Sequence, residues 1–202
     1  MNPLVPEPSR RPRCARCGLP AATCLCGLVV RIDNAIDVLV LQHPREVREA
    51  KGSARLLGLS LVRCRIAVGE VFDADALDAL LHGEGRRSVL LYPDAGRVEA
   101  ASAGAAPARP TQLVVLDGTW RKSWRMLMSN PALQGLPRWP LAPAEPGVYG
   151  ALRKARLPTQ LSTLEATCAA LALLEGDAAR HAPLLAAFSR FVGERTAFAA
   201  PK

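Results

Sequence analysis

Two short runs of apolar residues constrain the fold of this chain more than any other feature of its sequence. Residues 35–41 (AIDVLVL) and 113–116 (LVVL) are aliphatic at nearly every position, without alternation between apolar and polar side chains. Such strands are buried on both faces, as in parallel sheets whose crossover helices cover both sides. Because helical patterns follow these runs, we predict an α/β fold with a mostly parallel sheet flanked by helices.

The predicted strands and helices alternate after residue 34. The strands are predicted at 35–41, 59–66, 88–92 and 113–116. The helices are predicted at 44–57, 73–81, 119–128, 162–175 and 183–198. Residues 93–110 and 130–150 are predicted to be irregular because they are rich in proline, glycine or alanine. Ligands of parallel sheets bind where strands end, so we expect a site in the loops after Leu41, Leu91 and Leu116.

The charge of the chain indicates the kind of partner it binds, and its first residues indicate its cellular compartment. The formal net charge is +8 and the pI about 9.7, which favours a polyanionic partner. The sequence has no apolar run long enough to predict a transmembrane helix. Residues 1–13 are rich in proline and arginine and lack the apolar core of a secretory signal, so we predict a disordered arm and a cytoplasmic protein.

Four of the six cysteines lie close together near the start of the chain, in two pairs: Cys14 with Cys17, and Cys24 with Cys26. Two close pairs of thiolates can supply the tetrahedral ligand set of a structural zinc ion. We therefore predict a small zinc knuckle over residues 14–33. An iron–sulfur cluster, a redox dithiol and free thiols are the alternatives. The isolated Cys64 and Cys168 are interpreted as core residues.

A polar turn follows the aliphatic run 113–116. Its residues are Asp117-Gly118-Thr119-Trp120, and an acid at the carboxyl end of a buried strand lies where α/β active sites form. The alternative is an ordinary strand–helix junction in which Asp117 or Thr119 caps the helix. Cations and aromatic residues then alternate, which suits contacts with phosphates and bases, although the two tryptophans could equally be core residues: Arg121, Lys122, Trp124 and Arg125.

Five motifs together resemble the DTW-domain family in their order and spacing. They are the four-cysteine cluster, Gln42-His43-Pro44-Arg45-Glu46, Tyr92-Pro93, Asp117-Gly118-Thr119-Trp120 and Leu161-Ser162-Thr163-Leu164-Glu165-Ala166. The resemblance runs from about residue 13 to about residue 175. It implies a SPOUT-like catalytic domain over residues 34–202 with a knotted C-terminal half. It also implies a tRNA-uridine aminocarboxypropyltransferase that moves the 3-amino-3-carboxypropyl group of S-adenosylmethionine (SAM) to N3 of a uridine, expected in the variable loop.

The resemblance and the strand-end positions together assign roles to single residues. Asp117 is the candidate base, and Thr119 and Trp120 complete the candidate catalytic group. The SAM site is expected around Leu91, Tyr92, Leu116, Leu161, Ser162 and Thr163. The tRNA surface is expected at Arg16, Arg45, Arg48, Lys51, Arg55, Arg121, Lys122 and Arg125, with a solvated face as the alternative for these cations.

Three other functions stay open at this level. One is a SPOUT-like RNA methyltransferase with the same cofactor, and another is a zinc-knuckle RNA-binding module without enzymatic activity. The third is a redox protein that uses Cys14 and Cys17. The oligomeric state is not fixed by the sequence, and a monomer is slightly favoured.

Overall fold

The structure is a computed structural model and describes residues 12–49, 52–93, 110–141 and 161–199. Its centre is a five-stranded, wholly parallel sheet in the order β2-β1-β4-β3-β5. The strands are β1 (Asp37–Gln42), β2 (Cys64–Val68), β3 (Ser88–Leu91), β4 (Gln112–Asp117) and β5 (Arg138–Trp139). The predicted α/β class and parallel sheet are therefore confirmed.

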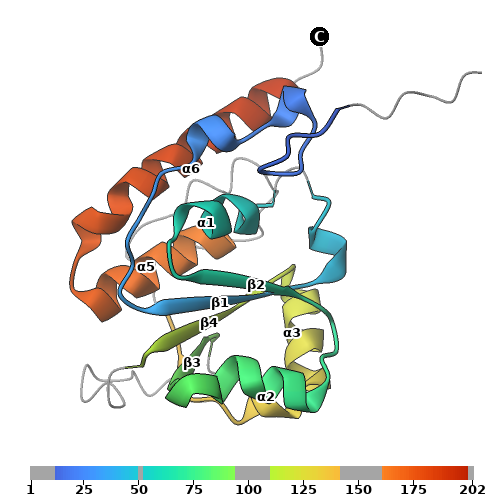
Figure 1. The fold of residues 1–202 in the computed structure, drawn as a ribbon, viewed down its shortest axis with the longest axis vertical. Helices are drawn as coiled ribbons and strands as arrows, with labels where there is room; N and C mark the ends of the chain where they lie inside the picture. The colour runs from blue at the N-terminus through green and yellow to red at the C-terminus, as the bar shows by residue number, and fades with distance from the viewer. Residues whose placement is uncertain (1–11, 50–51, 94–109, 142–160, 200–202) are drawn as a thin grey trace, which may run out of the picture.

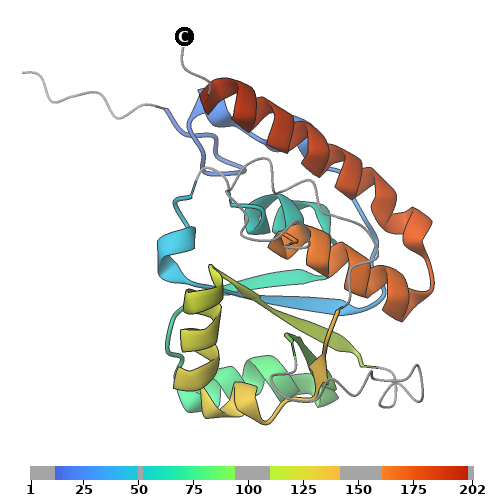
Figure 2. The same ribbon diagram turned by 180° about the vertical axis from the view of Figure 1, so that it is seen from behind.

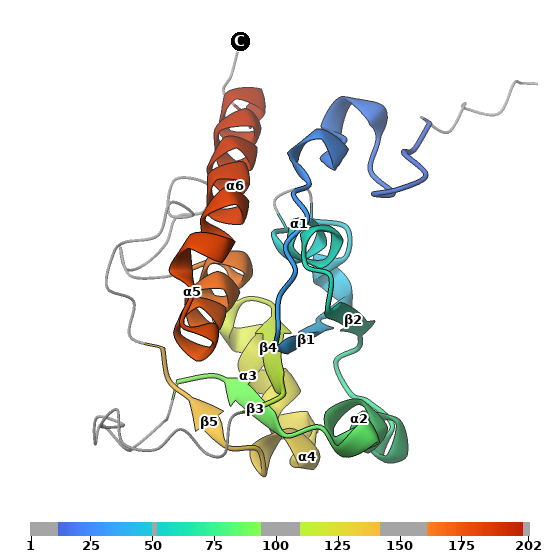
Figure 3. The same cartoon turned by 60° about the vertical axis from the view of Figure 1, so that its left-hand side comes forward.

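Helices cover both faces of this sheet (Figures 1 and 2). One face carries α1 (Ala54–Ser60), α5 (Thr163–Glu175) and α6 (Ala178–Ala199). The other face carries α2 (Ala74–His82), α3 (Trp120–Ser129) and the short α4 (Pro131–Gln134). Figure 3 shows the two helical layers on either side of the strands.

The aliphatic runs serve both faces because successive side chains of a strand point to opposite sides. In β1, Val38 and Val40 join the core under α1, α5 and α6, whereas Leu39 and Leu41 join the core over α2 and α3. The side chains of β4 divide in the same way. This double burial explains why these strands show no polar alternation.

The connections of β1 and β4 create a crevice at one edge of the sheet. These two strands are neighbours, yet β1 leads to α1 on one face and β4 leads to α3 on the other. The chain therefore diverges beyond their carboxyl ends, as it does where open α/β sheets bind their ligands.

The prediction of one helix from Pro44 to Leu57 is wrong. Pro44–Glu46 forms a single 3-10 turn, and the α-helix begins only at Ala54. Gly52 lies between them, and glycine disfavours helix continuation. The cations placed on that helix therefore do not share one face, and Lys51 lies outside the described residues.

Other boundaries also differ from the predictions. The strand predicted at 59–66 begins at Cys64, because Leu59 and Ser60 complete α1. The segment predicted as irregular after residue 130 contains α4 and β5, and α6 begins five residues before the predicted residue 183, with Pro183 inside it. The predicted arm falls mostly on residues 1–11, which lie outside the described residues.

The region around the cysteines packs on the same core as the sheet. Leu25 and Leu28 are buried against the cluster that contains Phe188 of α6. Arg195 of α6 also donates a hydrogen bond to the carbonyl oxygen of Thr23 at 2.6 Å. Among the described helices, none has the length and apolar character needed to cross a bilayer.

Candidate active site and metal centre

Asp117 is the central polar residue at the crevice. It ends β4 directly beside Gln42, the last residue of β1, because these two residues are register partners. The Asp117 Oδ2 atom accepts a hydrogen bond from Gln42 Nε2 at 2.8 Å, and its Oδ1 accepts one from Thr163 Oγ1 at 2.7 Å. The carboxylate is buried. Three segments far apart in sequence thus meet on one carboxyl group.

The turn after Asp117 starts α3 without using this carboxylate as the helix cap. Thr119 is the N-cap, and its hydroxyl accepts a hydrogen bond from the Lys122 backbone N–H. A side chain at Gly118 would come within 3.1 Å of the Lys122 Cβ atom, so glycine allows the first turn of α3 to lie close to the strand end. Of the two alternatives for capping, the structure selects Thr119.

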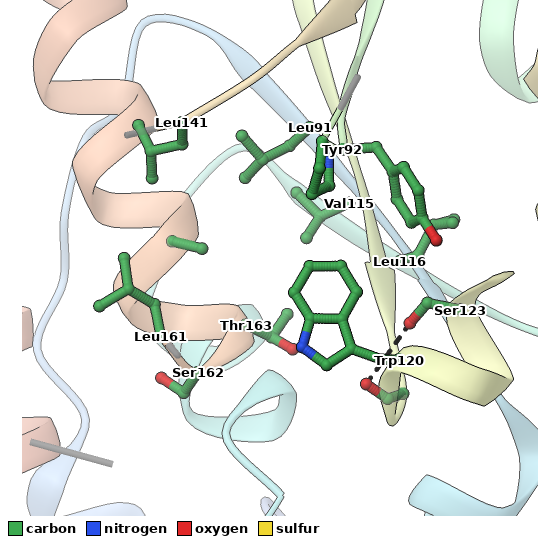
Figure 4. Close-up of a pocket in the computed structure, with 13 residues that line it drawn as sticks. Leu91, Tyr92, Val115, Leu116, Trp120, Ser123, Leu141, Leu161, Ser162 and Thr163 are labelled. Carbon is green, nitrogen blue, oxygen red and sulfur yellow. Dashed lines mark hydrogen bonds between the residues drawn. The ribbon is translucent and has the colours of Figure 1, made fainter. Parts of the chain in front are cut away.

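A pocket of about 360 Å³ opens above the carboxyl ends of β3 and β4 (Figure 4). All six residues predicted to hold the cofactor line it: Leu91, Tyr92, Leu116, Leu161, Ser162 and Thr163. Trp120 also lines it, and Figure 4 shows its indole between the start of α5 and the strand ends. We call this cavity the strand-end pocket. Its size lies within the range of small-molecule sites, about 300–1,000 Å³.

The walls of the strand-end pocket are mostly apolar, and an aromatic contact and a cation–π contact hold its rings in place. Tyr92 meets Trp120 edge-to-face with 6.1 Å between the ring centres, and the Arg138 guanidinium lies 5.8 Å from the Tyr92 ring centre. Burial raises the pKa of the Tyr92 phenol, so this group stays neutral at physiological pH.

The start of α5 is fixed by a capping box. Ser162 Oγ accepts a hydrogen bond from the Glu165 backbone N–H, and the buried Glu165 carboxylate accepts one from the Ser162 backbone N–H. The first turns of α5 and α3 both contribute lining residues. The positive ends of two helix dipoles therefore face the pocket and favour a ligand that carries a negative group.

Two ion pairs hold α3 against the loops that follow β1 and β2. The Lys122 ammonium lies 2.7 Å from the buried Glu46 carboxylate. Glu70 bridges His43, at 2.9 Å, and Arg125, at 3.4 Å. Partial desolvation of Glu70 opposes ionisation, but the hydrogen bonds from His43 and Arg125 prevail and lower the pKa of this carboxyl group.

The four cysteines near the N-terminus form one cluster, the cysteine cluster. Their Sγ atoms lie within 4.8 Å of one another. The Sγ–Sγ distances are 3.6 Å for Cys14 and Cys26 and 3.7 Å for Cys17 and Cys24. A tetrahedral zinc ion with Zn–S bonds of about 2.3 Å requires sulfurs about 3.8 Å apart, so this donor set fits zinc.

Backbone geometry shapes the cysteine cluster, and the surroundings of its thiols shift their pKa values in opposite directions. Gly18 has φ +69°, a left-handed conformation, and its N–H donates to the carbonyl oxygen of Cys14 at 2.8 Å. The backbone N–H groups of Cys17 and Arg16 lower the pKa of the Cys14 thiol to about 6. Desolvation and the neighbouring sulfurs raise the pKa of Cys26 to about 12. A divalent cation among the sulfurs would relieve their mutual repulsion.

The cations predicted to bind RNA lie in separate elements, on the knuckle, around the 3-10 turn and on α3. Arg16 lies on the knuckle, Arg45 and Arg48 lie around the 3-10 turn, and all three are exposed. Arg55 instead donates hydrogen bonds to the backbone oxygens of Cys17 and Val47, so it ties the knuckle to this turn. The remaining three cations, Arg121, Lys122 and Arg125, share α3 beside the pocket.

Sequence reasoning missed several residues of the site. Gln42 was recognised as part of a motif but not as a partner of Asp117, because the register between β1 and β4 is a tertiary property. Ala166 ends a recognised motif but was not expected in the pocket, and Ser123 and Leu141 line it without a sequence signal that we can identify. Arg153, Lys154 and Arg156, whose charge would suit the SAM carboxylate or tRNA phosphate, lie outside the described residues.

Comparison with known proteins agrees with this geometry. Residues 11–196 match the DTW domain. The chain is 31% identical over 176 residues to tRNA-uridine aminocarboxypropyltransferase 2 of Drosophila melanogaster, covering 83% of this chain and 68% of the fly protein. It is 29% identical to the proteins of the same name from Macaca fascicularis and Mus musculus, covering 85% of this chain and 60% and 59% of theirs.

The chain thus spans about three fifths of the length of the two mammalian relatives. No solved structure matches it significantly. Because the match to the DTW domain extends over nearly all of the sequence, this chain belongs to the DTW-domain family.

Proposed function

We propose that this chain is a tRNA-uridine aminocarboxypropyltransferase, which transfers the 3-amino-3-carboxypropyl group of SAM to N3 of a uridine, in the variable loop of tRNA. The observation that carries the proposal is the strand-end pocket, whose lining residue Thr163 donates a hydrogen bond to the buried carboxylate of Asp117. The names of the fly, macaque and mouse relatives support the same activity.

The strand-end pocket has the features that a SAM site requires. Its apolar walls and aromatic rings suit an adenine ring, and the two helix N-termini suit a carboxylate. When bound, SAM supplies an electrophilic carbon on a sulfonium. Selection of the aminocarboxypropyl carbon over the methyl group is a matter of orientation, which the walls formed by Leu91, Leu116 and Leu161 would impose.

Asp117 is the residue that we propose as the acceptor of the N3 proton. Uridine N3 is protonated at neutral pH, so a bond from N3 to carbon requires the loss of that proton. The proton passes to the Asp117 carboxylate as the N3 electron pair forms the new bond to carbon. The electrons of the broken C–S bond stay on sulfur, and methylthioadenosine leaves. Gln42 and Thr163 orient the carboxylate during this transfer.

The cysteine cluster is proposed to hold a structural zinc ion. The near-tetrahedral spacing of its sulfurs supports zinc, and four protein ligands leave no position for a substrate. Thiolates of this kind persist in a reducing compartment, and we place the protein in the cytoplasm for that reason. The SPOUT relationship and the knotted C-terminal half stay predictions, because residues 142–160 between β5 and α5 lie outside the described residues.

Label transfer to an unmodified tRNA transcript tests the proposal. One reaction contains SAM labelled in its methyl group, and a parallel reaction contains SAM labelled in the carboxyl carbon of its methionine part. We expect carboxyl label in the RNA and no methyl label. A transcript whose variable-loop uridines are replaced by cytidine should accept no label.

The other outcomes separate the alternatives. Methyl label alone would replace the proposal with a methyltransferase. An absence of both labels, together with no SAM binding by calorimetry, would leave an RNA-binding module. Carboxyl label on the cytidine-substituted transcript would contradict the variable loop but keep the transferase.

A further inference from the structure

Helix α3 carries an exposed row of large apolar side chains. The proposed transfer reaction does not explain why this row is exposed. Trp120 and Trp124 are 56% and 57% exposed, and Met128 is 40% exposed. The three residues are spaced by four along the helix and so lie on one face. The adjoining face of the helix is buried through Ser123, Met126 and Leu127. We call the exposed residues Trp120, Trp124 and Met128 the α3 stripe.

Cations flank the α3 stripe along its length. Arg121 and Arg125 are exposed beside it, and the helix sequence WRKSWRMLMS contains no acidic residue. Arg125 is paired with Glu70, at 3.4 Å. Within the described part of the chain, Arg121 has no ion-pair partner, and no ring contact holds the indole of Trp124. A row of large apolar side chains beside the unpaired charge of Arg121 suits a single-stranded polyanion with stacking bases.

The α3 stripe is also continuous with the strand-end pocket. Trp120 lines the pocket, and Trp124 lies one turn away, about 6 Å farther along the helix axis. The pocket is the proposed SAM site, so a uridine that reaches the bound SAM beside Trp120 has its neighbouring nucleotide in reach of Trp124. This continuity favours the RNA substrate as the occupant of the α3 stripe.

We propose that the α3 stripe is a stacking platform for an unpaired nucleotide next to the modified uridine, with Trp124 as its central ring. This inference rests on the proposed function for the identity of the ligand in the pocket and of the RNA substrate. Stacking on Trp124 and phosphate contact with Arg121 hold the flanking nucleotide, so the platform determines RNA binding and leaves SAM binding unchanged. Stacking tolerates any base, so the platform selects unpaired structure and not sequence.

Two substitutions at one position test the platform in the full-length protein. Trp124→Ala should weaken the binding of unmodified tRNA by roughly 5- to 150-fold, the range expected for one lost base stack. Trp124→Phe keeps an aromatic face and should stay close to wild type. SAM affinity, measured by calorimetry, should be the same in all three proteins. Leu173→Ala is the matched control, because Leu173 is 65% exposed on α5, away from α3.

RNA binding is measured by fluorescence anisotropy with labelled tRNA and without SAM, so the result does not depend on transfer. Weakened binding by Trp124→Ala would support the platform even if the label-transfer experiment failed. Binding within twofold of wild type for Trp124→Ala would overturn it. Sedimentation of wild type as a dimer and of Trp124→Ala as a monomer would also overturn it, because the occupant would then be a second copy of the chain.

Discussion

The cysteine cluster and the strand-end pocket both gather reactive side chains, but they assemble them over very different sequence distances. The cluster draws four sulfurs from residues 14–26 through tight turns. The pocket needs the ends of β3 and β4 and the starts of α3 and α5, and the neighbouring Asp117 carboxylate is held from β1 and α5. The first is a closed ligand set that stabilises structure, whereas the second keeps open space for a substrate.

The largest effect on the transfer rate should come from neutralising the Asp117 carboxylate. Asp117→Asn keeps the size of the side chain and an acceptor for Gln42, but the amide cannot take a proton. We expect kcat for aminocarboxypropyl transfer to fall by about 10²- to 10⁴-fold. The measurement is single-turnover transfer from carboxyl-labelled SAM.

Asp37→Asn is the matched control for this variant. Asp37 begins β1 at the opposite edge of the sheet, where it lies 3.5 Å from Arg86. Its transfer rate should stay within about twofold of wild type. Equal loss in both variants would mean that Asp117 acts on folding and not on chemistry.

The cluster should show the reverse pattern, with a loss of stability and little loss of chemistry. Cys17→Ser removes one of four sulfur ligands, so bound zinc should fall from about one per chain to near zero. We expect the free energy of unfolding to fall by about 3 kcal/mol or more, a size typical of a lost metal site. Metal analysis and thermal melting measure the two effects.

The control for the cluster is a cysteine outside it. Burial raises the pKa of the Cys64 thiol to about 12, so this residue behaves as an unreactive packing group. Cys64→Ala should keep the zinc and cost about 1 kcal/mol of stability. Unchanged zinc content in Cys17→Ser would show that the cluster does not bind the metal as proposed.

The contrast also explains which parts of the molecule could be predicted from sequence. The cysteine spacing, the buried strands and the cap at Thr119 are local patterns, and the structure shows the cluster, the strands and the cap in place. The pairing of Gln42 with Asp117 depends on strand register, and the hydrogen bond from Thr163 to the same carboxylate depends on tertiary packing. Local sequence does not encode these features strongly.

A smaller effect should come from the residue that orients the catalytic carboxylate. Thr163→Val keeps the shape of the side chain but removes the hydroxyl that donates to Asp117 Oδ1 at 2.7 Å. We expect kcat to fall about 10-fold, equivalent to about 1.4 kcal/mol, the scale of one lost hydrogen bond to a charged group. Thr167→Val, one turn along α5, removes a hydroxyl that donates to the Thr163 carbonyl oxygen and should change kcat less than twofold. Similar losses of kcat in both variants would mean that the Thr163 hydroxyl does not orient the Asp117 carboxylate.

The smallest effect should come from a backbone position in the knuckle. Gly18 and Gly176 share the left-handed conformation, with φ of +69° and +68°, so alanine at either position should cost about 1 kcal/mol of stability. At Gly18, however, the new methyl group would also approach the Arg55 side chain to 3.1 Å, beside the turn that positions Cys14 and Cys17. At Gly176 the space is open. Gly18→Ala should therefore lower zinc affinity in a competition with a chelator, whereas Gly176→Ala should lower only the melting temperature. Equal zinc affinity in the two variants would mean that strain at Gly18 does not disturb the four sulfur ligands. The geometry of the cysteine cluster would then depend more on its packing against α6 than on its own turn.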